Sequence, residues 1–389
     1  MKFVVNGDEM TIAIKRVAAT FPKRSVIPPI IKFEAAEESV FLTAVQPNKR
    51  VSVHVPAFVV DPGVVAVNVD DVSLICGLDH DVTYEDDGKK LTAANQKKRR
   101  STGLRDLGII RDWEDYAFKP FGSIATPELM DAFKVTDGAR SDDETRAVLT
   151  AFCLNTREMV TLDGFHLVLR KVKVQDAAHD GNLLLPGETY ADMKNLIVNK
   201  KDGDVSIECC EKCVKLSCDD FTYEIVPIAG EFIKYEQIIP KTYKLGIEAS
   251  AKEMLGVAKE YSKYRGNRRN VEFLAIGSGI TTMSLVTDSG YLADKLECCA
   301  VSAVNVDYDD SLFLFAHNIK YMLDVLNAMD EDKMRVTFNS IVSPATFTTE
   351  KTTALLLPIR VNDGGANELN VDGMLEFMKP MRETLQIPA

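Results

Sequence analysis

The chain has 389 residues, 46% of them hydrophobic and 27% charged, a mixture that is typical of a globular protein with two or three domains and excludes a disordered or collagen-like chain. Its 46 basic and 58 acidic residues give a net charge of −12, which excludes a protein that coats nucleic acid by overall charge alone. No apolar run is long enough for a membrane-spanning helix, and the first residues do not form a signal peptide, so we expect a cytoplasmic protein with no membrane partner.

Patterns of secondary structure recur three times along the chain in the same order: a helix, a group of strands, a second helix and a hairpin. The first helices are predicted over residues 8–21, 126–134 and 250–264, with alternating strands within residues 30–55, 148–174 and 271–304. The second helices are predicted over residues 70–78, 188–198 and 318–329, and the hairpins over residues 82–94, 205–218 and 334–348. Ser250 followed by Glu253 is typical of a capping box at the start of the third copy.

The recurrence has a period of about 120 residues, which is the size of a small domain. It predicts an α+β protein with domains over residues 1–120, 121–243 and 244–361, and with residues 362–389 as an extension or as the end of the third domain. Three like domains with free strands at both ends of the chain can close into a ring if two chains pair edge to edge. Such pairing also removes exposed strand edges.

Basic residues gather on or just after the predicted helices and near the hairpin of the first copy. Each one alone is typical of a solvated surface residue, but their clustering favours contact with a polyanion. Loose contacts with phosphates give weak, salt-sensitive binding that does not depend on base sequence. The candidates are Lys15, Arg16, Arg24, Lys97, Lys98, Arg99, Arg100, Arg140, Lys194, Lys200, Lys201, Lys259, Lys263, Arg265, Arg268 and Arg269.

The cluster Cys209, Cys210, Cys213 and Cys218 leaves two interpretations open. Thiolates at this spacing can share one zinc ion. We favour two short strands around a turn at residues 211–212, because alternate side chains of a strand point to opposite faces and no second pair of ligands follows. We therefore expect no metal and no cofactor.

Catalytic motifs are also missing from the sequence. The five histidines are scattered, and none lies in an HExxH or triad string. Glycine-rich phosphate-binding loops are absent, and the acidic runs at residues 85–87 and 307–310 are typical of solvated hairpin tips. We do not expect an enzyme, and a metalloprotein or hydrolase is the least favoured interpretation.

A set of short strings occurs along the chain in a characteristic order and spacing. The strings are MKF at residues 1–3 with RSVIP at 24–28, LDGFHL at 162–167, GEFIKY at 230–235 with IPK at 239–241, YMLDVLNA at 321–328, NSIVSPA at 339–345 and LLLPIR at 355–360. Together they resemble the β sliding clamps, the processivity subunits of bacterial DNA polymerase III, whose matching strings include TDGHRL and VVMPMR. The resemblance extends from residue 1 to about residue 361.

This resemblance implies a head-to-tail homodimer whose six similar domains form a ring, with helices lining the hole and sheets outside. Such a ring encircles double-stranded DNA of any sequence, tethers the DNA polymerase and catalyses nothing. A closed ring cannot dissociate sideways, so the polymerase stays at high effective concentration near its template without tight DNA contacts. The basic residues would then face DNA, with Arg24 matching an inner-surface arginine of the family.

The resemblance also implies a pocket between the second and third domains. It receives short apolar motifs, rich in Leu and Phe, from DNA polymerase and clamp-loader subunits. A few apolar anchors in such a cleft supply most of the affinity. The matching positions are Leu149, Leu162, Gly164, Phe165, His166, Leu167, Ile233, Gln237, Ile238, Asn318, Tyr321, Val342, Pro344, Leu355, Leu356, Leu357, Pro358, Ile359 and Arg360.

The chain departs from the family pattern at this pocket. Leu162, Phe165 and His166 stand where the family has Thr, His and Arg, and Ile233 and Gln237 stand where it has Pro and Arg.

The chain also continues past the family's usual end, so that the last residues can cover or extend the pocket. A second, less favoured alignment takes residues 378–382 as the family ending and residues 361–377 as an insertion. The last part of the first domain, residues 101–116, also departs in length and charge from the family strand that pairs across the dimer. This departure and the acidic charge leave one alternative: a clamp-fold adaptor that binds peptides and does not encircle DNA.

Overall fold

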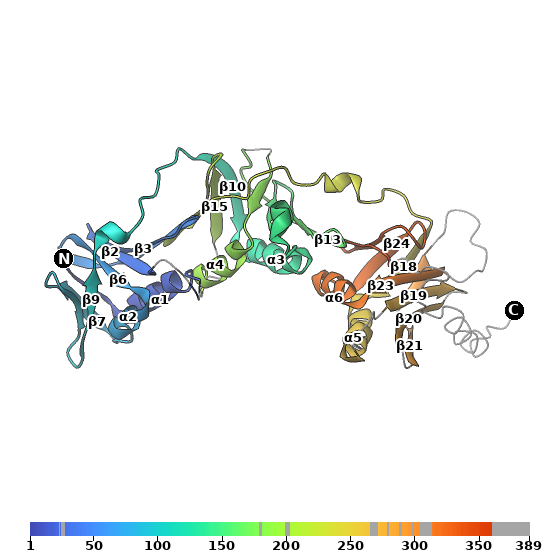
Figure 1. Cartoon of the computed structure of the whole chain (residues 1–389), viewed down its shortest axis with the longest axis horizontal. Coiled ribbons are helices and arrows are strands. Elements are labelled where there is room, and N and C mark those ends of the chain that lie inside the picture. The colour runs from blue at the N-terminus through green and yellow to red at the C-terminus, as the bar shows by residue number, and fades with distance from the viewer. Residues whose placement is uncertain are drawn as a thin grey trace. The chain divides into compact units, whose positions relative to one another are not determined.

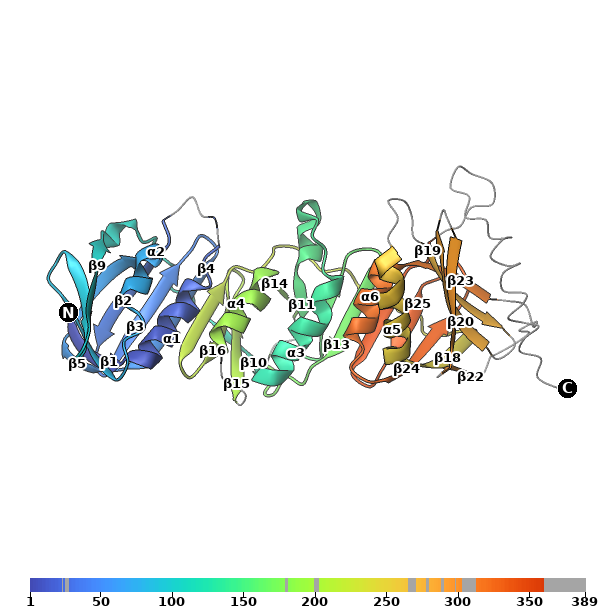
Figure 2. The same ribbon diagram turned by 90° about the horizontal axis from the view of Figure 1, so that it is seen from below.

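The computed structural model describes residues 1–359, apart from residues 23, 25–27, 179–180, 199–202, 265–270, 278–279, 288–289, 298 and 303–312. This part of the chain is mixed α+β, with antiparallel sheets and few helices (Figures 1 and 2). It divides into two compact units. Unit 1 holds Met1–Lys134, Asp143–Met159 and Val172–Phe232, and unit 2 holds Val135–Asp142, Val160–Lys171 and Ile233–Ala389. No described helix is long and apolar enough to cross a membrane.

One antiparallel sheet dominates unit 1. Among the described residues its strand order is β10-β15-β16-β17-β4-β3-β2-β6-β9-β8-β7-β1-β5. The bounds are β1 Lys2–Asn6, β2 Ile30–Ala36, β3 Ser39–Val45, β4 Lys49–Pro56, β5 Phe58–Asp61, β6 Gly63–Asn68, β7 Asp81–Asp86, β8 Lys90–Ala94, β9 Arg99–Arg105, β10 Lys119–Ala125, β15 Asp204–Cys209, β16 Val214–Cys218 and β17 Phe221–Ile225. Unit 1 also holds the pair β11 (Phe152–Leu154) and β14 (Leu183–Leu185).

The helices of unit 1 are α1 (Gly7–Ala18), α2 (Val69–Val72) and α4 (Glu188–Leu196), with the 3-10 turns η1 (Ser73–Ile75), η2 (Leu107–Ile109) and η4 (Glu144–Thr150). The helix α3 (Thr126–Thr136) and the strand β12 (Glu158–Leu162) have residues in both units. Buried side chains alternate along the strands, as in β4, and α1 covers β3 and β4. The apolar face of each element is therefore buried on one common core.

Unit 2 contains two groups of strands. The first runs β13-β26-β25-β24-β18-β22 and the second β21-β20-β19-β23. The bounds are β13 His166–Lys171, β18 Leu245–Ser250, β19 Val271–Gly277, β20 Ile280–Thr287, β21 Gly290–Leu296, β22 Cys299–Ser302, β23 Phe313–Asn318, β24 Lys333–Phe338, β25 Ala345–Thr348 and β26 Thr352–Leu356. Its helices are α5 (Ala251–Tyr261) and α6 (Ile319–Ala328), with the 3-10 turns η3 (Asp137–Ala139), η5 (Tyr235–Gln237) and η6 (Ser262–Tyr264).

The six predicted helices are confirmed, although α2 is shorter than predicted and continues as η1. Local capping explains where they begin. The Asn6 side chain accepts hydrogen bonds from the amides of Asp8 and Glu9 at 3.0 and 3.1 Å, and Ser250 caps α5 by accepting from the Glu253 amide at 3.1 Å. These bonds satisfy amides that have no partner inside the helix. The three predicted hairpins are likewise present as β7–β8, β15–β16 and β24–β25.

The threefold recurrence extends to individual hydrogen bonds. Each first helix follows a strand that pairs antiparallel with the hairpin of the same copy, as β1 with β7, β10 with β15 and β18 with β24. In each copy the first amide of the helix donates to the carbonyl just before that hairpin. The three bonds are Gly7 N to His80 O at 2.8 Å, Thr126 N to Gly203 O at 2.9 Å and Ala251 N to Asp332 O at 2.7 Å. We call the three copies module 1 (β1 to β9), module 2 (β10 to β17) and module 3 (β18 to β26).

The modules are joined by equivalent strand ladders. In the first joint β4 of module 1 pairs antiparallel with β17, the last strand of module 2, from Lys49 opposite Ile225. In the second joint β13 of module 2 pairs with β26, the last strand of module 3, from His166 opposite Leu356. Five residue pairs make each ladder. The exact domain limits 1–120, 121–243 and 244–361 stay predictions, because the compact units divide the chain at other places.

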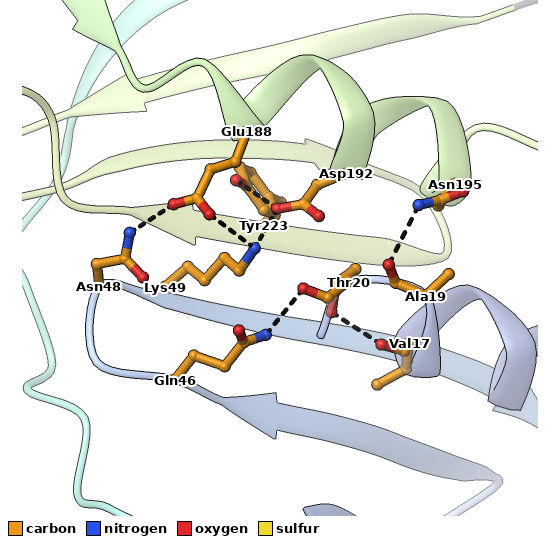
Figure 3. A network of polar contacts seen from close by, with 10 residues as sticks. All are labelled: Val17, Ala19, Thr20, Gln46, Asn48, Lys49, Glu188, Asp192, Asn195 and Tyr223. Carbon is orange, nitrogen blue, oxygen red and sulfur yellow. Dashed lines mark hydrogen bonds and ion pairs between the residues drawn. The ribbon is translucent and has the colours of Figure 1, made fainter. Parts of the chain in front are cut away.

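A buried polar network lies at the first joint (Figure 3). The Lys49 ammonium is 2.6 Å from Asp192 Oδ2 and 3.3 Å from Glu188 Oε2, and the Tyr223 hydroxyl donates to Asp192 Oδ2 at 3.0 Å. Burial raises the pKa of Asp192, and the charge of Lys49 offsets this only in part. Because the network joins β4, α4 and β17, it ties module 1 to module 2 inside unit 1.

We predict that Lys49→Met lowers the free energy of unfolding by about 3–5 kcal/mol, because it leaves a buried carboxylate without its cation. The double variant Lys49→Met/Asp192→Leu removes both charges and should recover most of that loss. Urea unfolding of the single and double variants measures both effects. Equal losses in the single and double variants would show that the ion pair is not what holds this joint.

Candidate functional site

Three neighbouring strands of unit 2 have adjacent ends along one edge of their sheet, where β26 ends and β13 and β25 begin. Strand β26 lies between β13 and β25, and Leu356 at its end is opposite both His166 and Ala345, the first residues of those strands. The loop before β13, the chain after β26 and the turn before β25 therefore lie together. Helix α6 packs against β13 and β26. This edge gathers residues from three distant parts of the sequence.

Large apolar side chains are exposed at this edge. Phe165, Leu357, Ile341 and Val342 are 53, 41, 53 and 62% exposed. The Leu357 amide donates to the Phe165 carbonyl at 2.9 Å, and the Phe165 ring stacks on Tyr321 of α6 at 5.4 Å between centroids. We call these five residues the apolar rim. Exposed apolar side chains gathered at one place are typical of a binding surface.

A polar network supports the rim from below. The buried His166 ring stacks on Tyr321 at 4.7 Å. Its Nδ1 is 3.1 Å from Asp163 Oδ1, and its Nε2 is 3.2 Å from the Gly138 carbonyl and 3.8 Å from Asp324 Oδ2. Burial raises the pKa of the Asp324 carboxyl, whereas hydrogen bonds from His166 and the backbone outweigh burial and lower the pKa of Asp163. The stack of Phe165 on Tyr321 on His166 therefore rests on fixed polar partners.

The three strands below the rim are held by a second polar group. Asp330, which follows α6, is 2.8 Å from the Arg170 guanidinium of β13 and accepts hydrogen bonds from Thr349 and Thr352 at 2.6 and 3.1 Å. Arg170 also donates to the Thr352 hydroxyl at 2.8 Å. Burial alone would raise the pKa of Asp330, but the Thr349 hydrogen bond and Arg170 hold it below its usual value.

The other predicted pocket residues differ in exposure. Leu162, His166, Leu167, Leu355 and Leu356 are buried and belong to the interior of unit 2, whereas Gly164, Ile233, Gln237 and Ile238 are exposed. Asn318 caps α6 by accepting from the Lys320 amide at 2.9 Å. Pro344, Pro358 and Ile359 are partly buried, Leu149 is buried in unit 1, and Arg360 lies outside the described residues.

Sequence reasoning missed two features of this site. Ile341 was not among the predicted pocket residues, although it precedes Val342 and is 53% exposed against 62% for Val342. The stack on His166 was also missed, because stacking depends on α6 and β13 lying side by side. The one sequence signal for Ile341 was its place in the string NSIVSPA at residues 339–345, next to the predicted pocket residue Val342.

Most of the described candidates for DNA contact are exposed at helix ends or turns. Lys15 lies in the last turn of α1, Lys194 in the last turn of α4, and Lys259 near the end of α5. Cations in the last turn also stabilise the helix itself, because they interact favourably with the negative end of its dipole. Lys263, Arg24, Lys97, Lys98 and Arg99 are exposed, whereas Arg100 and Arg140 are partly buried. Lys200, Lys201, Arg265, Arg268 and Arg269 lie outside the described residues.

Arg16 has a structural role that its sequence context did not indicate. Its side chain is 9% exposed, its guanidinium is 2.7 Å from Asp220 Oδ2, and it lies over the Phe221 ring at 5.7 Å. It therefore links α1 to the start of β17. A DNA contact through Arg16 stays a prediction, but the ion pair makes it the weakest of the basic candidates.

The cysteine cluster forms the hairpin that the sequence favours. Cys209 ends β15, Val214 starts β16, and the Cys210 amide donates to the Cys213 carbonyl at 2.9 Å. Cys209 and Cys210 line a cleft of about 960 Å³ in unit 1 that none of the predicted site residues lines. Burial raises the pKa of Cys213 to about 12. Among the described residues, no three His, Cys, Asp or Glu side chains are arranged to hold a metal ion.

Comparison with known proteins gives consistent relatives. No family model matches the chain. It is 21% identical over 389 residues to the beta sliding clamp of Staphylococcus aureus (strain Mu50), a match that covers 92% of this chain and 99% of that protein. It is 22% identical over 391 residues to the beta sliding clamp of Staphylococcus epidermidis (strain RP62A), with the same two shares.

Solved structures agree with these relatives. A putative DNA polymerase III beta subunit from Eubacterium rectale superposes with a TM-score of 0.82 at 18% identity, and the DNA polymerase sliding clamp from Bacillus subtilis with 0.80 at 20%. Each match covers 93% of this chain and 100% of the solved chain. The fold is that of the β sliding clamps, and the resemblance seen in the short sequence strings is confirmed.

We predict that Asp330→Asn lowers the free energy of unfolding at pH 7 by about 2 kcal/mol, because it removes the charge that Arg170 and two hydroxyl groups hold. The folded state lowers the pKa of Asp330, so its contribution is present above the ordinary value of about 3.9 and is lost as the pH falls through the lower folded value. Urea unfolding between about pH 3 and pH 7 should therefore show a smaller pH dependence for the variant. A parallel pH dependence for both chains would contradict this role.

Proposed function

We propose that this chain is a sliding clamp. In this proposal two copies join head to tail around double-stranded DNA, and the ring tethers DNA polymerase and other partners for processive synthesis. The ring is cytoplasmic and catalyses no reaction of its own. The observation that carries the proposal is the threefold hydrogen-bond register, found in a chain that matches sliding clamps along nearly their whole length.

The repeated joints support ring closure by a second copy. In each of the two joints within the chain, the first residue of β4 or β13 is opposite the last residue of the final strand of the next module, β17 or β26. The corresponding third ladder would use β21, at one edge of its sheet, and β9, which pairs with β6 only through Leu104 and Arg105. Within the described part of the chain, the backbone of residues 99–103 has no strand partner on that side. Unpaired strand edges favour pairing with another chain.

The register of this third joint follows from the other two. Ile225 and Leu356 are the last residues of β17 and β26, and they are opposite the first residues of β4 and β13 in the joints. Within their own modules they are also opposite Val214 and Ala345, the first residues of the preceding strands. The equivalent residue in module 1 is Gly103, opposite Lys90. Antiparallel pairing of Gly103 with Gly290 of a second copy then places Ser101 opposite Leu292. The exposed apolar side chains Leu74, Leu107 and Ile109, which lie in η1 and η2 next to β9 in the fold or the chain, would be covered in such a joint.

We predict that a chain carrying Ser101→Cys and Leu292→Cys forms a disulfide-linked dimer, because opposite residues of an antiparallel pair are close enough for a disulfide. The dimer should have twice the chain's mass of 43.1 kDa. Oxidised samples are compared by denaturing electrophoresis and by light scattering. The matched control is Arg99→Cys/Leu292→Cys, which has the same cysteine count in the wrong register and should link poorly.

The same linked dimer tests whether the ring surrounds DNA. Loaded in its reduced form on nicked circular DNA by a clamp loader and oxidised afterwards, it should be retained in high salt and released when the circle is cut, because charge contacts alone are lost in salt. Peptide binding without such retention would favour the adaptor alternative, which the net charge of −12 supports. A strict monomer at micromolar concentration would contradict the ring.

The apolar rim is proposed as the site where partners dock. Its exposed side chains and the stacked Phe165 and Tyr321 rings suit a short peptide rich in Leu and Phe. DNA polymerase and clamp-loader subunits are the expected carriers of such motifs. The buried network around His166 keeps the stack in place before the peptide arrives, which lowers the ordering cost of binding.

We predict that Leu357→Asp weakens binding of a fluorescein-labelled peptide Ser-Leu-Ser-Leu-Phe by at least about 30-fold, because a charge replaces an apolar anchor that supplies about 2 kcal/mol or more. Ile12→Asp is the matched control, since Ile12 is exposed to the same extent on α1 and lies in unit 1. Fluorescence anisotropy gives both affinities. Equal weakening by the two variants would place the binding site elsewhere.

A further inference from the structure

The chain leaves its last described strand through the apolar rim itself. After β26, Leu357 is a rim residue, and the Ile359 amide donates to the Ala316 carbonyl at 2.8 Å. The remaining 30 residues, 360–389, lie outside the described residues and begin beside the rim. Any apolar segment among them is therefore tethered close to the partner site.

The sequence after residue 360 holds such a segment. Residues 361–373 are mostly polar and include three glycines, with Val361, Ala366, Leu369 and Val371 as the apolar exceptions, a composition compatible with a spacer. Next comes Met374-Leu375-Glu376-Phe377-Met378, in which four of five residues are apolar. A glycine-rich spacer of about 15 residues spans on average about 20–23 Å. That length is sufficient for residues 374–378 to return to a site that lies at the start of the spacer.

We propose that residues 374–378, called the tail segment, dock on the apolar rim of the same chain and compete there with partner peptides. This inference rests on the proposed function of the rim. It identifies a regulator of that site within the chain, so that a partner gains access only when it displaces the tail segment.

The chemistry of the two surfaces is complementary. In an extended tail segment, Leu375 and Phe377 point to the same side, two residues apart. The rim offers the exposed side chains of Phe165, Leu357 and Val342 to receive them. The carboxylates of Asp163 and Asp324 lie next to the ring stack that includes Phe165, and basic Lys379 and Arg382 follow the tail segment. These two basic residues are opposite in sign to the two carboxylates, whereas Glu376, the one charged residue within the tail segment, would point away from the side of Leu375 and Phe377 in an extended segment.

Tethering makes this competition effective even if the intrinsic affinity is modest. A short tether gives an effective concentration on the order of 1 mM. If the tail segment alone binds with a dissociation constant of about 100 μM, the tether lowers the apparent affinity of an added peptide about tenfold. Removal of the competing side chains should reverse this effect without any change in the rim.

The test compares two variants of the full chain. Leu375→Asp/Phe377→Asp disables the tail segment, and Leu385→Asp/Ile387→Asp places the same charges elsewhere in residues 360–389 as the matched control. The probe is the labelled Ser-Leu-Ser-Leu-Phe peptide, followed by anisotropy. We expect about tenfold tighter binding to the first variant than to the wild-type chain and unchanged binding to the control.

A labelled peptide with the sequence of residues 370–382 provides the second measurement. It should bind the Leu375→Asp/Phe377→Asp chain, and an added Leu357→Asp should abolish that binding. If the first probe binds the wild-type and tail-variant chains equally but Leu357→Asp weakens it, the tail inference is overturned and the proposed function stands. If the first probe binds neither chain, the proposed function of the rim itself fails.

Discussion

The structure depends on one constraint, that the edge of a β-sheet must be paired or protected. Unpaired backbone amides and carbonyls at an edge recruit another strand. Two of the module edges find their partners inside the chain, β4 with β17 and β13 with β26, in five-residue ladders of equivalent register. The edges of β9 and β21 have no such ladder among the described residues. For the proposed function, these two edges are the physical reason to expect a second copy.

The two internal joints also share their electrostatics. Each ladder begins with a basic side chain, Lys49 or His166, that lies next to an aspartate on the second helix of the following module. Lys49 is 2.6 Å from Asp192 of α4, and His166 is 3.8 Å from Asp324 of α6. In both cases burial raises the pKa of the aspartate. The third joint departs from this pattern.

At the third joint, Gly290 stands at the start of β21, where the other two joints have Lys49 and His166. Next to the second helix of module 1, α2, the exposed side chain is Leu74, where the other two joints have an aspartate. A joint between copies built in this way would rely on backbone pairing and apolar contact without a buried charge. Buried ion pairs add geometric specificity but also carry a desolvation cost. The two internal joints can be permanent, whereas a joint between copies must open for a closed ring to admit DNA. Because Gly290 has no charged side chain to form an ion pair, the third joint agrees with that requirement.

The second joint also forms the apolar rim, the proposed partner site. Because β26 lies between β13 and β25, the same register that joins modules 2 and 3 brings Phe165, Leu357 and Val342 to one edge. His166 belongs to the joint through its ladder with Leu356 and to the rim through its stack on Tyr321. Assembly of the module joint and formation of the apolar rim are therefore one structural event.

The sequence by itself determined the helices, the hairpins and their threefold order, because these depend on residues close together in the chain: Asn6 and Ser250 cap helices locally, and the turn after Cys210 closes its own hairpin. Only the tertiary structure decided which edges meet, why Arg16 is held by Asp220 and why Ile341 joins the rim. These outcomes depend on pairs of residues far apart in sequence, whose contacts are set by strand register and by the packing of α6 and α1. Local sequence patterns predict neither the strand register nor the helix packing.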